Sequence, residues 1–79
     1  MDAVETQVIE VITGVLQSKN RAVSVDGSSR MGAPTVWDSL AFVEIFLGVS
    51  THFNLEVSDD DAMSFMSVPE IVNFVTARL

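Results

Sequence analysis

Residues 35–46, "TVWDSLAFVEIF", place an aspartate and a serine directly before a run of apolar residues. Aspartate is a preferred N-cap residue, so this pattern predicts a helix that begins at Ser39 and runs to about residue 53. Ser39 would then occupy the first helical position, where free backbone N–H groups and the helix dipole favour an attached anion. The Ser39 hydroxyl is therefore a candidate for covalent attachment of a phosphate ester. In the simpler interpretation, Asp38 is only a helix cap.

The predicted helix over residues 39–53 is apolar around most of its circumference. At about 100° per residue, its less apolar positions fall in one sector, which holds Ala41, Glu44, Gly48, Thr51 and His52. The remaining apolar surface is more than one side of a small helical core needs. We therefore expect this helix either to lie at the centre of the fold or to expose part of its apolar surface as a docking face.

The residues before this helix predict one further helix and a long loop. Apolar residues at helical spacing predict a helix over residues 2–18, and Asp2 and Glu5 form a weak capping pattern at its start. Residues 19–37 contain two glycines, Pro34 and several serines, which favour a loop over a strand. A loop of this length needs anchors in the core, and the expected anchors are Val23, Val25, Met31 and Trp37.

The residues after residue 53 predict two shorter helices. Ser58 is a suitable N-cap, and the three aspartates that follow it suit the first turn of a short third helix. Ser67 and Glu70 form a capping box, and Pro69 lies where its missing N–H costs little. The sequence therefore predicts an all-α, four-helix bundle with a short third helix and a long first loop, forming a single domain over residues 1–79.

Composition excludes several classes of function. The chain has no cysteine, so a disulfide framework, a thiolate metal site and a cysteine nucleophile are excluded. Its net charge of −7 disfavours nucleic acids and anionic membranes as partners and favours basic protein surfaces. The first residues lack the pattern of a signal peptide, and no apolar run is long enough to span a membrane. We expect a cytoplasmic monomer.

The chain offers no catalytic or metal-binding constellation of its own. Its single histidine, His52, lies 13 residues after Ser39 on the same predicted helix, about 20 Å along the axis, and so cannot activate that serine. The acidic run at residues 59–61 lacks the spacing of a calcium loop, so a solvated first turn is the better interpretation. Trp37 is interpreted as a core anchor under the loop, or as a residue that flanks whatever occupies Ser39.

The segment "DSL" at residues 38–40 resembles the attachment motif of acyl carrier proteins and of the related peptidyl and aminoacyl carriers. The order of features after it also matches that family: an apolar helix that ends in Phe53, a short turn, an acidic third helix and a closing helix after "SV". The resemblance implies that a phosphopantetheinyl transferase attaches 4′-phosphopantetheine to Ser39, and that Asp38 aids recognition. It implies a carrier without enzymatic activity, which receives cargo from a loading enzyme and presents it to a downstream synthase or transferase.

The resemblance and the apolar second helix together suggest which residues meet the arm and the partners. Beside Ser39, we expect contacts to the arm from Trp37, Asp38 and Leu40. We expect contacts to partner enzymes from Phe42, Glu44, Ile45, Leu47, Val57, Asp59 and Met63. The resemblance also implies that Phe46, Phe53, Val68 and Ile71 lie on the inner faces that can enclose an acyl chain.

Departures from the family pattern bear on the pathway and the cargo. Carriers of fatty acid synthesis usually have a glycine shortly before the motif and several acids on the second helix, whereas Trp37 precedes the motif here and Glu44 is the helix's only acid. This favours a carrier of secondary metabolism or of amino acids, with acyl and aminoacyl cargo both left open. Large rings at the inner positions predict small or polar cargo. The competing class is a helical interaction module without an arm.

Overall fold

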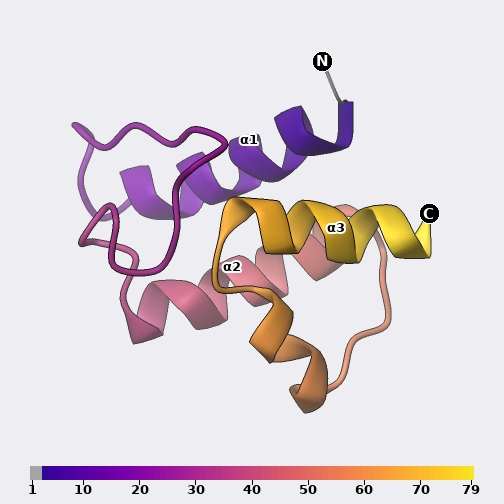
Figure 1. The fold of residues 1–79 in the computed structure, drawn as a ribbon. Helices are drawn as coiled ribbons and strands as arrows, with labels where there is room; N and C mark the ends of the chain where they lie inside the picture. The colour runs from indigo at the N-terminus through magenta and orange to yellow at the C-terminus, as the bar shows by residue number, and fades with distance from the viewer. Residues whose placement is uncertain (1–2) are drawn as a thin grey trace.

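The structure, a computed structural model, describes residues 3–79 and holds three α-helices and one 3₁₀ helix in that range (Figure 1). The helices are α1 (Ala3–Gln17), α2 (Ser39–His52), η1 (Asp59–Ser64) and α3 (Val68–Arg78). The predicted all-α architecture, with a long first loop and a short third helix, is confirmed. The proposed cap at Asp2 lies outside the described residues.

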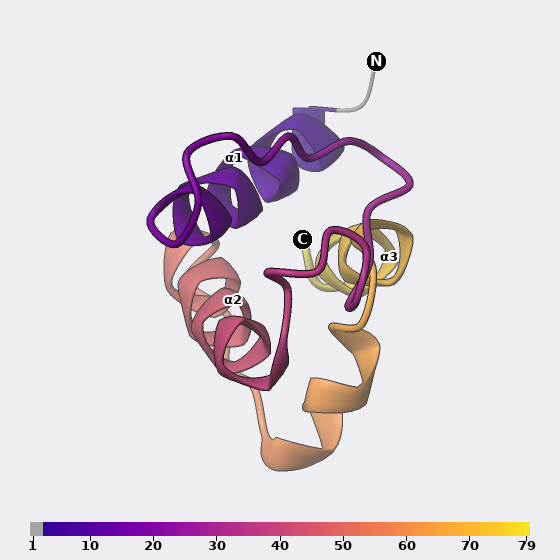
Figure 2. The ribbon, with the colours of Figure 1, turned by 90° about the vertical axis from the view of Figure 1, so that its left-hand side faces the viewer.

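The three α-helices enclose one hydrophobic core. α1 packs against both α2 and α3, and Figures 1 and 2 show α1 running across the other two helices while η1 extends away from it. Each of the three α-helices contributes buried side chains at helical spacing, as expected for amphipathic helices, whereas η1 itself contributes none. The buried core consists of Val8, Ile12, Leu16, Trp37, Ala41, Ile45, Val49, Phe65, Val68, Ile71, Phe74 and Val75.

The orientation of α2 differs from the sector drawn from its sequence. Ala41 is fully buried, and a Cβ atom at Gly48 would lie 3.2 Å from Val11 Cγ1 of α1. These two small residues therefore face inward, together with Ile45 and Val49, because they let α2 approach the rest of the core closely. Apolar residues on the opposite side are left exposed, so α2 is partly exposed rather than enclosed at the centre.

The long loop is held by side-chain anchors and by backbone pairing. Trp37 is fully buried, and Val23, Val25 and Met31 are partly buried against the core, so the four predicted anchors are confirmed. The N–H of Met31 donates to the Met66 carbonyl at 2.8 Å, and the N–H of Val68 donates to the Ser29 carbonyl at 3.0 Å. These bonds join the loop that leads to Ser39 to the start of α3.

The last two helices begin at the predicted caps. The N–H of Ser58 donates to Asp61 Oδ2 at 2.9 Å, but the element that follows is a 3₁₀ helix. The Ser67 hydroxyl accepts from the N–H of Glu70 at 3.3 Å and donates to Glu70 Oε1 at 3.1 Å. α3 therefore begins with the expected Ser67–Glu70 cap and with proline in its first turn. Within residues 3–79, no helix has both the length and the apolar character needed to cross a bilayer.

Candidate functional site: the start and outer face of α2

Ser39 is exposed at the first position of α2, as the sequence predicts. Asp38 precedes it in an extended conformation, and its Oδ1 accepts from the N–H of Ala41 at 3.0 Å. The Asp38 carbonyl accepts from the N–H of Phe42 at 2.8 Å. Asp38 therefore fixes the first turn of α2 through its side chain and its carbonyl, and Ser39 lies at the start of this fixed turn.

The residues at this helix start suit a phosphate ester on Ser39. In the described part of the chain, nothing hydrogen-bonds the Ser39 hydroxyl, so the oxygen is free to be substituted. The first N–H groups of a helix have no intrahelical acceptors, and here Asp38 uses that of Ala41 and leaves those of Ser39 and Leu40. These N–H groups and the helix dipole favour an anionic phosphate ester at this position.

Trp37 is a core anchor and does not flank an opening. Its side chain is fully buried, one residue before the Asp38 cap. Its indole N–H is buried without an acceptor among residues 3–79, which costs about 1–3 kcal/mol relative to a paired donor. The expected contact between Trp37 and the arm therefore does not fit its position. Trp37 instead fixes the end of the loop from which Asp38 and Ser39 emerge.

The outer face of α2 carries an apolar stripe that begins beside Ser39. Leu40, Val43 and Leu47 are 64%, 48% and 57% exposed, and their spacing places them on one side of the helix. We call these three residues the α2 stripe. Leu47 was an expected partner contact, whereas Val43 was missed. Its i+3 spacing from Leu40 and the i+4 spacing to Leu47 are the sequence signal that points to it.

Three further expectations for α2 have different outcomes. Ile45 is fully buried, so its assignment to the partner surface is wrong: it points into the core one turn after Ala41. Phe42 is partly buried against the core and offers only part of its ring to a partner. Glu44 is exposed, but its Oε1 lies 2.6 Å from Lys19 Nζ of the long loop. The single carboxylate of α2 is therefore already paired within the chain.

The expected contacts beyond α2 lie on or near η1. Met63 is 69% exposed, and Asp59 is exposed in the first turn of η1. Val57 is partly buried against the core. Asp59 and Met63 therefore remain available to a partner, and they give η1 an exposed acidic group and an exposed apolar group.

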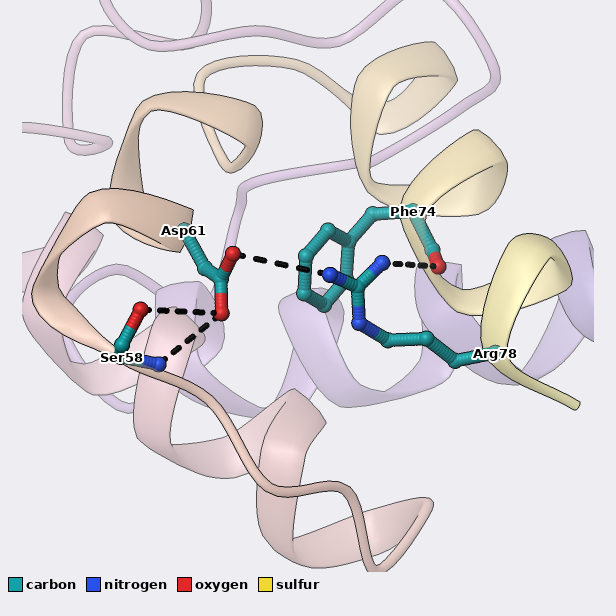
Figure 3. A network of polar contacts seen from close by, with 4 residues as sticks. All are labelled: Ser58, Asp61, Phe74 and Arg78. Atoms are coloured by element: carbon teal, nitrogen blue, oxygen red, sulfur yellow. Dashed lines mark hydrogen bonds and ion pairs between the residues drawn. The ribbon is translucent and has the colours of Figure 1, made fainter.

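Aromatic rings fill the space between α2, η1 and α3. The Phe46 and Phe65 centroids lie 4.8 Å apart, and the Phe65 and Phe74 centroids 4.9 Å apart, both with edge-to-face geometry. We call Phe46, Phe65 and Phe74 the aromatic column. The guanidinium of Arg78 lies 3.6 Å from the Phe74 ring centroid and covers the end of the column (Figure 3). Such contacts favour the rings in this arrangement beyond their burial alone.

An ion pair ties the covered end of the column to η1. Arg78 Nη2 lies 3.6 Å from Asp61 Oδ1, while the other oxygen of Asp61 accepts from the Ser58 N–H, as Figure 3 shows. Arg78 Nη1 also donates to the Phe74 carbonyl at 3.5 Å. Asp61 therefore joins the start of η1 to the end of α3 and belongs to a structural network. The described residues contain no cluster of three or more metal-ligating side chains.

The comparisons with known proteins agree with this geometry. The chain is 33% identical to an acyl carrier protein of Rickettsia bellii strain RML369-C over 75 residues, covering 95% of this chain and 85% of that protein. It is 31% identical to the acyl carrier protein of strain OSU 85-389 over 75 residues, covering 95% of this chain and 90% of that protein. An acyl carrier protein of Rickettsia canadensis is 25% identical over 77 residues, covering 98% of this chain and 87% of that protein. No family model and no solved structure matches the chain. The two relatives above 30% identity, each aligned over nearly the whole chain, show that this protein belongs to the acyl carrier protein family.

Proposed function

We propose that this chain is a non-enzymatic carrier that holds an acyl or aminoacyl group as a thioester on a 4′-phosphopantetheine arm attached to Ser39. The observation that carries the proposal is the free Ser39 hydroxyl at the first position of α2, held there by the Asp38 cap. The arm supplies the thiol that the cysteine-free chain lacks. Membership of the acyl carrier protein family supports the same role.

In the attachment step, Ser39 Oγ forms a bond to the phosphorus that carries the pantetheine of coenzyme A. The pyrophosphate bond breaks, adenosine 3′,5′-bisphosphate leaves, and the hydroxyl proton passes to a base of the transferase. Asp38 keeps the first turn of α2 in place during this step. The N–H groups of Ser39 and Leu40 stabilise the resulting phosphodiester.

The α2 stripe and the acidic surface around η1 form the proposed docking site for partner enzymes. The partners are the transferase, a loading enzyme and a downstream synthase or transferase. Because Lys19 neutralises Glu44, the centre of α2 offers a partner apolar side chains instead of free carboxylates. A complementary surface is therefore apolar at its centre and basic at its rim, where it meets Asp59.

The pathway and setting follow from the same features. A helix α2 with an exposed apolar stripe and one internally paired acid differs from the strongly acidic second helix that is usual in carriers of fatty acid synthesis. We place this chain in a dedicated biosynthetic pathway of secondary metabolism, as a monomeric, cytoplasmic carrier whose one domain spans the 79 residues.

Incubation with a broad-specificity phosphopantetheinyl transferase, coenzyme A and Mg²⁺ tests the proposal. Intact mass spectrometry should show one added arm on the wild type and none on Ser39→Ala. Ser58→Ala is the matched control, because Ser58 also lies at a helix start. This variant keeps Ser39 and should therefore receive one arm, as the wild type does. An unmodified wild type, or an unchanged addition in Ser39→Ala, would favour the interaction module in which Asp38 only caps α2.

A further inference from the structure

We infer that the aromatic column excludes long acyl chains from the interior, so that the cargo is a short or polar acyl unit that stays outside the helices. This inference rests on the proposed carrier function and concerns the class of cargo. It assigns Phe46, Phe65 and Phe74 as specificity-determining residues. Its basis is the way these rings occupy the space between α2, η1 and α3.

The rings are closely packed at the centre of the aromatic column. Phe65 is fully buried and contacts Phe46 on one side and Phe74 on the other, and Phe74 is only 7% exposed. The neighbouring core positions, Ile71 and Val75, are also fully buried. Because protein interiors are packed at nearly crystalline density, a chain can enter here only by displacing rings. Each displaced ring would lose its edge-to-face contacts.

The end of the column is held from outside. To swing away, Phe74 would have to leave the guanidinium of Arg78, which lies 3.6 Å from its centroid. Arg78 is in turn paired with Asp61, and Asp61 accepts from the Ser58 N–H at the start of η1 (Figure 3). Opening the column therefore disturbs the contact between η1 and α3 as well as the rings themselves.

The hollow beside the column does not suit an alkyl chain. It is an open depression of about 410 Å³, and its lining is mostly polar or charged: Asp61, Ser64, Glu70, Asn73, Phe74 and Arg78. An alkyl chain in it would meet carboxylates and a guanidinium, and would gain little of the free energy of apolar burial. A short or polar acyl unit has little apolar surface to bury, so it can remain in water on the arm.

The test compares acyl chains of different length on the same arm. Wild type, Phe46→Ala and Phe53→Ala are loaded with butyryl or octanoyl groups, and mass spectrometry verifies each loaded species before any further measurement. Phe46→Ala shortens the column at its half-buried end. Phe53→Ala is the matched control, because Phe53 is a partly buried ring at the C-cap of the same helix, and its ring contact is with His52 and not with the rings of the column.

In the wild type and in Phe53→Ala, we expect the butyryl and octanoyl forms to melt at the same temperature. In Phe46→Ala, the octanoyl form should melt higher than the butyryl form, since the chain can fill the vacated space. Burial of only two methylene groups would raise Tm by about 6–13 °C for a domain of this size. A Tm rise of this order in the octanoyl wild type, with NMR shifts at Phe65 and Phe74, would overturn the inference.

Two further results keep the inference separate from the proposed function. If Phe46→Ala shows no dependence on chain length, the column is not the determinant and the assignment fails, although the carrier function stands. If no arm can be attached to Ser39, the mass spectra reveal the failure of the carrier function before any melting experiment is made.

Discussion

Truncation of Leu47 to alanine tests whether partner binding depends on the α2 stripe. Leu47 is 57% exposed, so its substitution should leave the core intact. Full burial of a leucine side chain is worth about 1.5–3 kcal/mol, and a partner that covers the exposed 57% would gain about 0.9–1.7 kcal/mol from it. Leu47→Ala should therefore weaken docking roughly 5- to 20-fold.

Calorimetric titration against the phosphopantetheinyl transferase measures this loss as a change in Kd. The titration uses the Ser39→Ala background, so that attachment cannot proceed during the measurement. Leu79→Ala is the matched control: Leu79 is 70% exposed but follows α3, away from the stripe. Its Kd should equal that of the parent, and circular dichroism should show the same helix content in all variants.

The salt dependence of binding distinguishes apolar docking from electrostatic docking. Raising the ionic strength from about 0.1 M to about 1 M shortens the Debye length from about 10 Å to about 3 Å. Binding through the stripe should change little, because Glu44 is already paired with Lys19. Lys19→Ala frees this carboxylate and should make binding to a basic partner more sensitive to salt. Binding that disappears at high salt but tolerates Leu47→Ala would refute the reasoning.

Three further predictions concern the fold that positions the site. Trp37→Ala should lower the free energy of unfolding in urea by about 3–5 kcal/mol. Trp37→Phe should lower it clearly less, because this substitution keeps a ring in the core and also removes the unpaired indole N–H, and equal losses in the two variants would contradict the role of Trp37 as a core anchor. Gly14→Ala should stabilise the domain by about 0.8–1 kcal/mol and raise Tm by roughly 3–8 °C, because Gly14 lies inside α1 with open space where a Cβ would be added. Gly32→Ala should lower Tm, because Gly32 has a φ of +90°, which residues with side chains rarely adopt. A shift of the same sign in both variants would be inconsistent with this backbone geometry. Hydrogen bonds from Ser28 hold the pKa of Asp26 below its ordinary value of 3.8. The stability that this carboxylate contributes should therefore be present above pH 3.8 and be lost as the pH falls through the lowered pKa. An NMR titration of Asp26 with a midpoint at or above 3.8 would contradict this.

Local patterns in the sequence were sufficient for the helix starts and for Ser39. Asp38, Ser58 and Ser67 lie where their caps were expected, because capping depends on residues within one helical turn. The hydroxyl at the first position of α2 follows directly from the Asp38 cap. The anchors of the long loop were also predictable, because the few apolar side chains of a polar loop are removed from water only by packing against the core. The sequence alone therefore determined the element order and the candidate attachment residue.

The outward side of α2 was decided only by the tertiary structure. Because the helix is apolar around most of its circumference, periodicity does not choose between Ile45 and Val43 as the buried position. Packing makes the choice: Ala41 and Gly48 are small enough to let α2 approach its neighbours, so Ile45 turns inward and the stripe with Val43 turns outward. The pairing of Glu44 with Lys19 joins residues 25 positions apart and likewise needs the folded loop. Local sequence thus determines the position of Ser39, the proposed attachment residue, while long-range packing determines which side of α2 is exposed.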